Sequence, residues 1–551
     1  MEQPIMPVGV ENFEKLRRLG GYYIDKTTML SKLLKTPPFK PVVFTRPHNF
    51  GKTLALSMME SFFDIRKDSK KLFEGLVITE QQELCAEWMN QYPTIFFSFQ
   101  NIKCHNFVSA YGMLELEISR LCQNYLFLKD SEKNDPSTIR QFIKLLHMEA
   151  SMSEVKGALS LLMKMLYRHY EKPVILLLDA YDTPIACAEK QDYHKDMMDV
   201  MNGIFGTAMR EEEALKLAII SGCLSYANEG LFLGEGDCHI YSVMEESFCD
   251  SFGFTKSEVD QIFSDAGMKD QSELIKKWYG GYVIGQSELY CPWDVMHYVS
   301  KVQEDKTITP DKLSNHTSFY PFQELFTLDR QDKLETLLHD KTISEPVLSE
   351  LGCDFVEDDI WSRLLMEGYL SRADSATGRI LSLKIPNKKI KNKWEDAIVC
   401  QIKNTMNTND PNSYRVLMDA LWESDTTTAS KLISNLLFQT ICCDDCHEDF
   451  YCIFLSEILK GTDGTIDFNI GKESAKPDII IRDRKNRSAI IIEAKKAENI
   501  HSLNKACDEG IVQIITRQYD KGLGDGFQTV LSYSISFYQK TCMVKKLVIE
   551  E

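Results

Sequence analysis

The sequence lacks a hydrophobic run long enough to cross a membrane. Its longest apolar stretches, such as Val174–Leu178 and Ala489–Ile492, are far shorter than the about 20 residues that a transmembrane helix requires. The N-terminus reads Met-Glu-Gln-Pro and has neither the basic region nor the apolar core of a secretory signal. We therefore expect a cytoplasmic protein that has no membrane partner.

The sequence also lacks a disulfide framework, internal repeats and low-complexity segments. Its 16 cysteines are scattered along 551 residues rather than regularly spaced, which is typical of reduced thiols in an intracellular protein. One cluster, Cys442–His447, has residue types that bind zinc. Structural zinc needs a second pair of ligands at a suitable distance, and none is evident in the sequence. We therefore favour a structural role for this cluster over a metal site.

Positive charge is in short supply. Lys and Arg number 63 against 81 Asp and Glu, which gives a formal net charge of −18. Such an acidic chain is a poor candidate for coating nucleic acid non-specifically, because phosphate contacts need local Lys and Arg. The stretch Asp478–Lys505 is nevertheless locally basic. Together with the adjacent Lys476, its cations are Arg482, Arg484, Lys485, Arg487, Lys495, Lys496 and Lys505.

Strand-like and helix-like segments alternate in the region from Tyr22 to Val243. The strand-like runs are Pro41–Thr45, Thr94–Phe99, Pro173–Asp179, Leu217–Ser221 and His239–Val243. Amphipathic segments such as Leu54–Phe63 and Leu159–Tyr170 lie between them. This alternation predicts parallel βαβ units in a wound sheet, and therefore the α/β class.

The remaining sequence divides into a mainly helical middle region and a second α/β region. The middle region carries aromatic clusters at Trp278–Tyr282 and Tyr290–Trp293, which we interpret as core packing rather than as a base-stacking platform. The last region starts with the basic residues Lys388, Lys389, Lys391 and Lys393. Four strand-like runs follow: Thr465–Ile470, Asp478–Arg482, Ala489–Lys495 and Thr529–Tyr538. A helix is expected at Asn504–Tyr519, before the last of these runs. We expect domains at residues 1–247, 248–386 and 387–551.

The first candidate site follows the strand Pro41–Thr45, where the sequence reads Arg-Pro-His-Asn-Phe-Gly-Lys-Thr. Its second half matches a phosphate loop, and Arg46 replaces the first glycine of the usual pattern. Gly51 lets the backbone approach phosphate, Lys52 reaches the β- and γ-phosphates, and Thr53 can bind Mg²⁺. The helix that begins there adds its N-terminal dipole.

A second strand supplies the acidic partner of this loop. The apolar run Val174–Leu178 ends in Asp179, and the strand Leu217–Ile220 ends in Ser221. Parallel strands present such residues at one carboxyl edge, where Asp179 can hold Mg²⁺ beside a nucleotide. The sequence therefore predicts an ATP and Mg²⁺ site. Its expected residues are Arg46, Asn49, Phe50, Gly51, Lys52, Thr53, Asp179, Asp182 and Ser221, with Thr53 and Asp179 on the metal.

These motifs resemble one known family, the AAA-ATPase-like proteins that carry a C-terminal PD-(D/E)XK nuclease domain. The resemblance rests on Arg46–Thr53 together with Tyr23–Thr27, Tyr92–Phe99, Leu178–Pro184 and Phe252–Thr255. It implies a P-loop NTPase sheet, a helical middle region and a restriction-endonuclease-like α/β domain at the C-terminus. In this family the loop normally starts with arginine, so Arg46 fits the pattern.

The sequence departs from the family at residues that matter for hydrolysis. Relatives have Asp-Glu-Tyr-Asp where this chain reads Asp179-Ala180-Tyr181-Asp182, so the expected hydrolytic base is missing. Asp182 is an alternative base. A natural loss of the glutamate and an engineered Glu→Ala exchange would both leave alanine at position 180. His48 and Asn49 stand where relatives often have basic residues. A Thr-Gly-x-x-Arg stretch reads Ser-Gly-Cys-Leu-Ser at 221–225, which removes an arginine.

The second candidate site is a pair of carboxylates with a lysine. Asp478 opens one strand, and the next strand contains Glu493-Ala494-Lys495, whose outer two side chains share a face. A hairpin between the strands would bring Asp478 beside Glu493. Two carboxylates can then bind Mg²⁺ while Lys495 positions water, which is the chemistry of phosphodiester hydrolysis. The resemblance adds Glu448 as a further acidic metal ligand, and Gln513 and Tyr519 as residues for DNA contact or helix packing.

The sequence thus favours an ATP-binding module that controls an Mg²⁺-dependent nuclease with Asp478, Glu493 and Lys495 as catalytic residues. The expected partner is nucleic acid, with DNA favoured over RNA, and defence against foreign nucleic acid is an analogy-based role. P-loop modules of this kind often complete their sites across subunits, so a homo-oligomer is also expected. Two alternatives stay open: a nucleotide-gated nucleic-acid-binding or scaffold protein with lost hydrolysis, and a nuclease that uses the P-loop fold only to dimerise.

Overall fold

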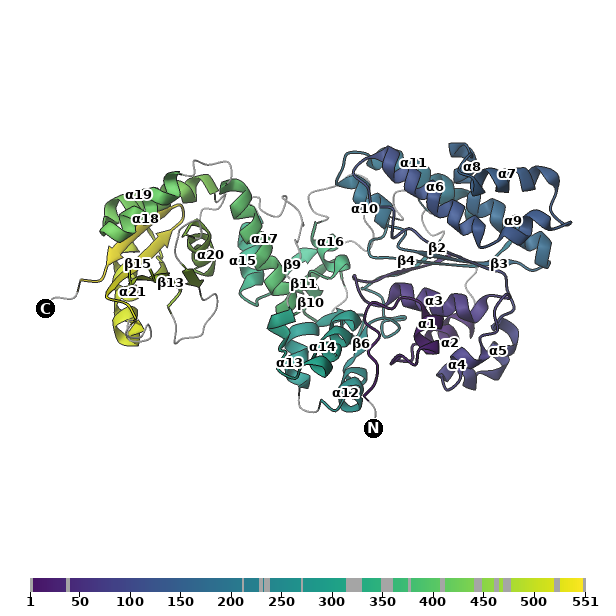
Figure 1. Cartoon of the computed structure of the whole chain (residues 1–551), viewed down its shortest axis with the longest axis horizontal. Coiled ribbons are helices and arrows are strands. Elements are labelled where there is room, and N and C mark those ends of the chain that lie inside the picture. Colours follow the sequence, from purple (N-terminus) through teal and green to yellow (C-terminus); the bar gives the residue numbers. More distant parts are fainter. Residues whose placement is uncertain are drawn as a thin grey trace. The chain divides into compact units, whose positions relative to one another are not determined.

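The fold is described from a computed structural model of the chain (Figure 1). The residues described are 3–35, 40–210, 213–226, 231, 238–268, 271–313, 330–347, 360–374, 378–406, 412–440, 448–459, 465–468, 477–519 and 526–548. The chain divides into two compact units. Unit 1 comprises Met1–Ser314 and Ser344–Ile390, and unit 2 comprises Asn315–Ile343 and Lys391–Glu551.

Unit 1 is built on a five-stranded parallel sheet in the order β2-β3-β4-β1-β5. The strands are β1 (Val42–Thr45), β2 (Thr94–Ser98), β3 (Val174–Asp179), β4 (Leu215–Gly222) and β5 (His239–Tyr241). The interior strand β3 is buried along its whole length, as expected for a strand covered on both faces. The sheet confirms the predicted α/β class and the strand-like runs on which it was based.

Helices cover both faces of this sheet (Figure 1). On one face lie α1 (Phe13–Arg18), α2 (Thr28–Lys35), α3 (Lys52–Phe63), α4 (Lys70–Phe73) and α5 (Gln82–Trp88); on the other lie α6 (Phe107–Gln123), α7 (Pro136–Leu146), α8 (Met152–Lys156), α9 (Ala158–Tyr170), α10 (Thr183–Glu189) and α11 (His194–Ala208). Alternate residues of β3 enter the two cores: Leu176 and Leu178 pack in one, and Ile175 and Leu177 in the other. This alternation follows from the two-residue period of a strand.

The chain that follows β5 forms short helices and two small sheets. The elements are β6 (Phe254–Thr255), α12 (Lys256–Asp265), α13 (Ser272–Tyr279), β7 (Tyr282–Ile284), β8 (Ser287–Tyr290), α14 (Pro292–Glu304), β9 (Ile343–Pro346), α16 (Ile360–Glu367), β10 (Ser371–Arg372) and β11 (Ile380–Lys384). The sheets have the orders β6-β8-β7 and β10-β11-β9. The mainly helical character of this region was predicted, whereas the two small sheets were not.

Unit 2 contains a five-stranded mixed sheet in the order β12-β13-β14-β15-β16. Its elements are α15 (Gln331–Leu338), α17 (Lys388–Met406, which starts in unit 1), α18 (Asn412–Glu423), α19 (Thr426–Thr440), α20 (Glu448–Leu459), β12 (Thr465–Phe468), β13 (Ile479–Asp483), β14 (Ser488–Lys496), α21 (Leu503–Arg517), β15 (Thr529–Tyr538) and β16 (Thr541–Lys546). Strands β14 and β15 are parallel, and the other pairs are antiparallel.

The sequence predicted four of these strands and α21, but it missed β16. The expected strand Thr465–Ile470 appears as β12 over Thr465–Phe468, and its last two residues lie outside the described residues. The cysteine cluster Cys442–His447 and Lys476 also lie outside them. Among the described helices, none has both the length and the hydropathy to cross a membrane.

Candidate nucleotide pocket and carboxylate site

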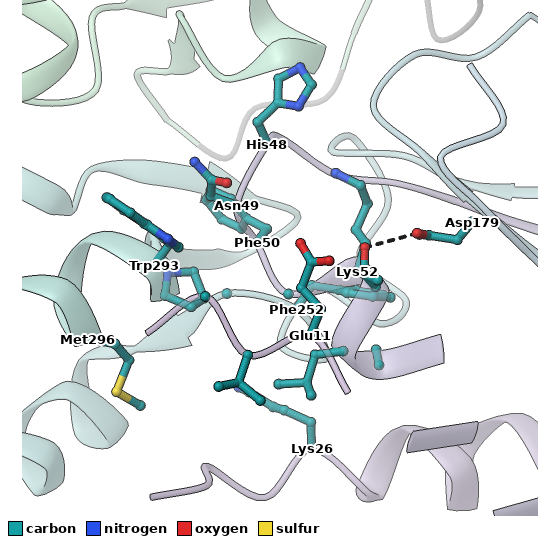
Figure 2. Close-up of a pocket in the computed structure, with 18 of the residues that line it drawn as sticks. Glu11, Lys26, His48, Asn49, Phe50, Lys52, Asp179, Phe252, Trp293 and Met296 are labelled. Carbon is teal, nitrogen blue, oxygen red and sulfur yellow. Dashed lines mark hydrogen bonds between the residues drawn. The ribbon is translucent and has the colours of Figure 1, made fainter. Parts of the chain in front are cut away.

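The carboxyl ends of β1, β3 and β4 meet at one edge of the parallel sheet of unit 1. A cavity of about 320 Å³ opens at this edge (Figure 2), which is within the size range of small-molecule sites. Of the residues that the sequence predicted for nucleotide, the cavity is lined by Asn49, Phe50, Gly51, Lys52, Thr53, Asp179 and Asp182. Residues between positions 49 and 182 therefore share one cavity because the strands that carry them are parallel members of one sheet.

The loop between β1 and α3 is shaped by two left-handed residues. Asn49 has φ 67° and Gly51 has φ 84°, and α3 begins directly after Gly51 at Lys52. A Cβ added to Gly51 would meet nothing within 4 Å. The backbone conformation, and not crowding, is therefore what favours glycine here. The free N–H groups of the first turn of α3 make this helix start suitable for an anion.

Lys52 already has three hydrogen-bond acceptors in this structure. Its Nζ donates to the carbonyl oxygens of Arg46 at 2.8 Å and Pro47 at 2.9 Å, and to Sγ of Cys223 at 3.2 Å. An ammonium group has three N–H donors, so the loop and Cys223 satisfy the lysine. Binding of a phosphate by Lys52 must therefore replace at least one of these contacts.

Asp179 is 1% exposed and accepts hydrogen bonds from three hydroxyl groups. Ser221 Oγ donates to Oδ1 at 2.8 Å, while Thr53 Oγ1 and Ser98 Oγ donate to Oδ2, both at 3.0 Å. The pairing of Thr53 with Asp179 is the arrangement that binds Mg²⁺ in P-loop nucleotide sites. The sequence prediction missed Ser98. Its position at the end of β2, in register with Asp179, was the available signal.

Two predicted residues, Arg46 and Ser221, do not line the cavity. The Arg46 side chain is fully buried and donates to the carbonyl oxygens of Thr45, Tyr241, Ser242 and Phe248. Burial lowers its pKa to about 10, so the guanidinium stays charged at neutral pH. Arg46 thus fastens the loop to the chain around and after β5, and Ser221 acts through its hydrogen bond to Asp179.

Ala180 and Asp182 follow β3 and both line the cavity. Ala180 has φ 52°, and its side chain carries no group that could accept a proton. One carboxylate oxygen of Asp182 accepts the backbone N–H groups of Cys223 at 2.7 Å and Leu224 at 2.9 Å. Burial raises the pKa of Asp182, while the backbone N–H groups and Lys52 act against this rise. These contacts make Asp182 an anchor for the chain after β4.

The side of the cavity away from Asp179 is formed by apolar groups that the sequence prediction did not assign to a site. Trp293 and Met296 of α14 lie across the cavity from Asp179 (Figure 2). Phe252 and Pro7–Val10 also line the cavity, together with the charged Glu11 and Lys26. Trp293 is 37% exposed. The interpretation of the aromatic clusters as core packing is therefore correct for the buried Trp278 and wrong for Trp293.

The second candidate site lies in unit 2, where β13 and β14 form the predicted hairpin. Ile479 pairs with Ile492, so Asp478 at the start of β13 lies next to Glu493. Asp478 Oδ2 accepts the backbone N–H of Ala494 at 2.8 Å. This register sets the two carboxylates side by side at one end of the hairpin.

Glu493 is a buried carboxylate with one oxygen unsatisfied. The side chain is 1% exposed, and Oε1 accepts from Lys495 at 3.3 Å and from Gln513 of α21. Among the described residues, Oε2 has no hydrogen-bond partner. Burial and the neighbouring Asp478 raise the pKa of Glu493 to about 7. A bound cation would reduce the repulsion between Asp478 and Glu493 and would give Glu493 Oε2 a partner. The two carboxylates therefore suit a hard divalent ion.

Lys495 links this pair to Glu448. Its Nζ lies 3.0 Å from Glu448 and 3.3 Å from Glu493, and these carboxylates raise the pKa of Lys495 although burial opposes them. The second oxygen of Glu448 accepts the N–H of Lys496 at 3.3 Å. In the described part of the chain, no group of three or more His, Cys, Asp or Glu side chains has a metal-binding arrangement. Glu448 thus contacts both the side chain of Lys495 and the backbone of Lys496, while its binding of metal stays a prediction.

The family match found by comparison with known proteins falls in unit 1. Residues 7–232 match a family described as "Predicted AAA-ATPase". A protein of Azotobacter chroococcum mcd 1, described as "Uncharacterized protein in vnfD 5'region", is 21% identical over 298 residues. The alignment covers 54% of this chain and 52% of that protein, so the chain spans about half the length of this relative. The phosphate loop and Asp179 lie inside the family match, whereas Asp478, Glu493 and Lys495 lie outside it.

Proposed function

We propose that the chain is an ATP-binding, Mg²⁺-dependent nuclease in which the P-loop unit controls a PD-(D/E)XK phosphodiesterase in unit 2. The observation that carries the nuclease half is the hairpin that sets Asp478 beside the buried, half-satisfied Glu493, with Lys495 on the same face. The ATP-binding half is supported by the match of residues 7–232 to the AAA-ATPase family and by the cavity around Lys52.

In the nucleotide half, Lys52 and the start of α3 would bind the phosphates, and Thr53 and Asp179 would hold Mg²⁺. The apolar side of the cavity, formed by Trp293, Met296 and Phe252, suits the flat face of a base. Hydrolysis is the weak step, because Ala180 carries no base and Asp182 is engaged with backbone N–H groups. We therefore expect tight binding of ATP with slow turnover.

In the nuclease half, Asp478 and Glu493 would hold a divalent cation. Such an ion lowers the pKa of a bound water and neutralises charge on the phosphate. Lys495, kept in place by Glu448, adds positive charge where negative charge develops in the transition state. Gln513 fixes the rotamer of Glu493 through its hydrogen bond to Oε1 and is itself 3.3 Å from Tyr519.

Helix α17 offers a route from nucleotide to nuclease, since it starts in unit 1 and continues into unit 2. Lys389 in its first turn forms an ion pair with Asp294 of α14 and lies 5.5 Å from the ring centre of Trp293. Asn387, just before the helix, donates to Gly280 O at 2.8 Å. A ligand that moves Trp293 would therefore act on the start of α17.

Nucleic acid is the proposed partner, with DNA favoured over RNA and defence against foreign nucleic acid as the proposed role. The turn between β13 and β14 and its flanks carry Arg482, Arg484, Lys485 and Arg487, which can contact phosphates. A homo-oligomer remains part of the proposal. Among the described residues, no arginine lines the cavity, and a second copy could supply one.

A cleavage panel tests this function. Plasmid DNA, single-stranded DNA and RNA are incubated with the full chain, with and without Mg²⁺ and ATP. Asp478→Asn and Lys495→Ala are expected to lower cleavage by about 10²-fold or more, while Lys431→Ala, an exposed lysine of α19, leaves it unchanged. Cleavage that survives both substitutions would refute the assignment of the site.

The absence of a base at Ala180 favours one second candidate, a nucleotide-gated nucleic-acid-binding or scaffold protein. Calorimetry with ATP, followed by phosphate release from the wild type and Ala180→Glu, separates the two functions. The scaffold gains support if ATP binds, Glu restores phosphate release, and no nucleic acid is cut under any metal condition.

A further inference from the structure

The phosphate-loop lysine contacts Cys223, and Cys223 in turn contacts His48; neither residue belongs to a predicted site. Cys223 follows β4, and its Sγ lies 3.2 Å from Lys52 Nζ and 3.3 Å from His48 Nδ1. Cys223 is 4% exposed, and both residues line the cavity. Figure 2 shows the amine of Lys52 and the ring of His48 on the same side of the loop. The three side chains thus form a connected chain at one end of the cavity.

The chemistry of these three side chains depends on a neutral thiol. Burial raises the pKa of Cys223 to about 12, so the group is S–H at neutral pH and can both accept from Lys52 and donate to an unprotonated His48 Nδ1. Sulfur is a weaker acceptor than the two carbonyl oxygens that also hold Lys52. A phosphate arriving at Lys52 therefore displaces Cys223 most easily, which leaves the S–H and the imidazole next to the phosphate.

The position of Cys223 and His48 indicates which phosphate they would contact. In phosphate loops the lysine reaches the β- and γ-phosphates, and Thr53, which is hydrogen-bonded to Asp179, would hold Mg²⁺. Cys223 contacts the end of the Lys52 side chain and His48 contacts Cys223, so we expect the outermost phosphate to be the one that reaches them. A diphosphate in the same pocket would leave the Lys52–Cys223–His48 contacts largely intact.

We propose that Cys223 and His48 form a contact pair for the terminal phosphate, so that they discriminate nucleoside triphosphate from diphosphate in place of the arginine that this chain lacks after β4. This inference rests on the nucleotide site proposed above and names two of its specificity-determining residues. The side chains supply one S–H donor and one imidazole N–H donor, and hydrogen bonds to a charged group are stronger than those between neutral groups.

The test compares ATP and ADP affinities by titration calorimetry for the wild type, His48→Ala, Cys223→Ala and Cys223→Ser. Each alanine variant is expected to bind ATP about 10-fold more weakly, a change of about 1.4 kcal/mol, and ADP within about 2-fold of the wild type. Cys223→Ser keeps a donor and is expected to recover most of the preference for ATP. Equal losses for ATP and ADP, or no loss in either alanine variant, overturn the proposal.

Thiol protection gives an independent readout. Alkylation of Cys223, followed by peptide mass spectrometry, is expected to slow at saturating ATP and to change little with ADP. Cys291 is the matched control, because it is buried and contacts Asn49 O of the same loop at 3.7 Å without lining the cavity. Protection of Cys223 by both nucleotides to the same extent would refute a terminal-phosphate contact.

Lys52→Ala separates failure of this inference from failure of the nucleotide site itself. If Lys52→Ala abolishes binding of both nucleotides while the Cys223 and His48 variants lose both equally, only the inference fails. If Lys52→Ala binds ATP like the wild type, the proposed nucleotide site fails. Thermal unfolding followed by circular dichroism verifies that each variant is folded.

Discussion

The charge on Glu493 should weaken the sheet of unit 2 at alkaline pH in the absence of metal. A carboxylate whose pKa rises from 4.5 to about 7 on folding costs about 3 kcal/mol once both states are ionised, since one pKa unit corresponds to 1.36 kcal/mol. The folded state binds this proton more tightly than the unfolded state. Stability is therefore present below pH 4.5 and is lost as the pH rises through about 7.

The isosteric change Glu493→Gln removes this charge. At pH 8 the variant should be more stable than the wild type by nearly the whole of this cost. At pH 5 the folded wild type is already protonated, so the stability difference is about 1 kcal/mol. The amide changes hydrogen bonding equally at both pH values. The difference between the stabilisation at pH 8 and at pH 5 therefore isolates the effect of the charge. We expect the variant to gain about 2–3 kcal/mol more at pH 8 than at pH 5.

Amide hydrogen exchange of peptides from β13 and β14 measures this difference, because it reports the opening free energy of the strands. With chelator present, exchange of the variant relative to the wild type should be about 50-fold slower at pH 8 than at pH 5, by the same linkage. Millimolar Mg²⁺ should slow exchange in the wild type and not in Glu493→Gln.

Glu509→Gln is the matched control, since this carboxylate on α21 is 61% exposed and lies 3.8 Å from Lys505. Its effect on exchange should be small at both pH values. If Glu493→Gln exchanges like the wild type at pH 8 without metal, the electrostatic account of the site is wrong.

Three further predictions follow from the packing and the ion pairs. Glu448→Gln should lower cleavage about 10- to 100-fold by loosening Lys495 while leaving Mg²⁺ affinity nearly unchanged, and an equal loss of Mg²⁺ affinity would instead make Glu448 a metal ligand. Lys389→Ala should leave ATP binding intact but reduce any effect of ATP on cleavage; an undiminished effect would exclude the route through α17. Gly510→Ala should destabilise the α21 packing by about 2 kcal/mol or more, because its Cβ would lie 2.1 Å from Ser534 Oγ. Gly112→Ala on α6, where nothing lies within 4 Å, should stabilise unit 1 by about 1 kcal/mol; equal thermal shifts for the two glycine variants would contradict the packing argument.

The strands and the hairpin could be predicted because their signals are local. A strand alternates its faces every two residues, and the charged turn at Asp483–Arg487 lies directly between two apolar runs. This is why the neighbourhood of Asp478 and Glu493 could be predicted across only a short hairpin. Strand β16, Thr541–Lys546, was missed because its apolar run is only three residues long and is followed by two lysines.

Interpretations that depended on the direction of a side chain were less secure. Arg46 belongs to the phosphate loop in sequence, but its guanidinium enters the core because four backbone carbonyl oxygens accept from it. Trp293 belongs to an aromatic cluster in sequence, yet its ring lines the cavity. Neither direction is encoded in spacing, since both result from what packs around the residue.

The sequence alone determined the order of the candidate motifs along the chain. These are a phosphate-loop motif at residues 46–53, an acidic residue after an apolar strand at Asp179, and a Glu-x-Lys motif at 493–495. Each is a short motif whose meaning depends on neighbouring residues and on the periods of helices and strands. Tertiary structure decided the contacts between distant residues. Cys223 reaches His48 across 175 positions, and Glu448 reaches Lys495 across 47, because packing of strands and helices sets such distances and no local pattern specifies them.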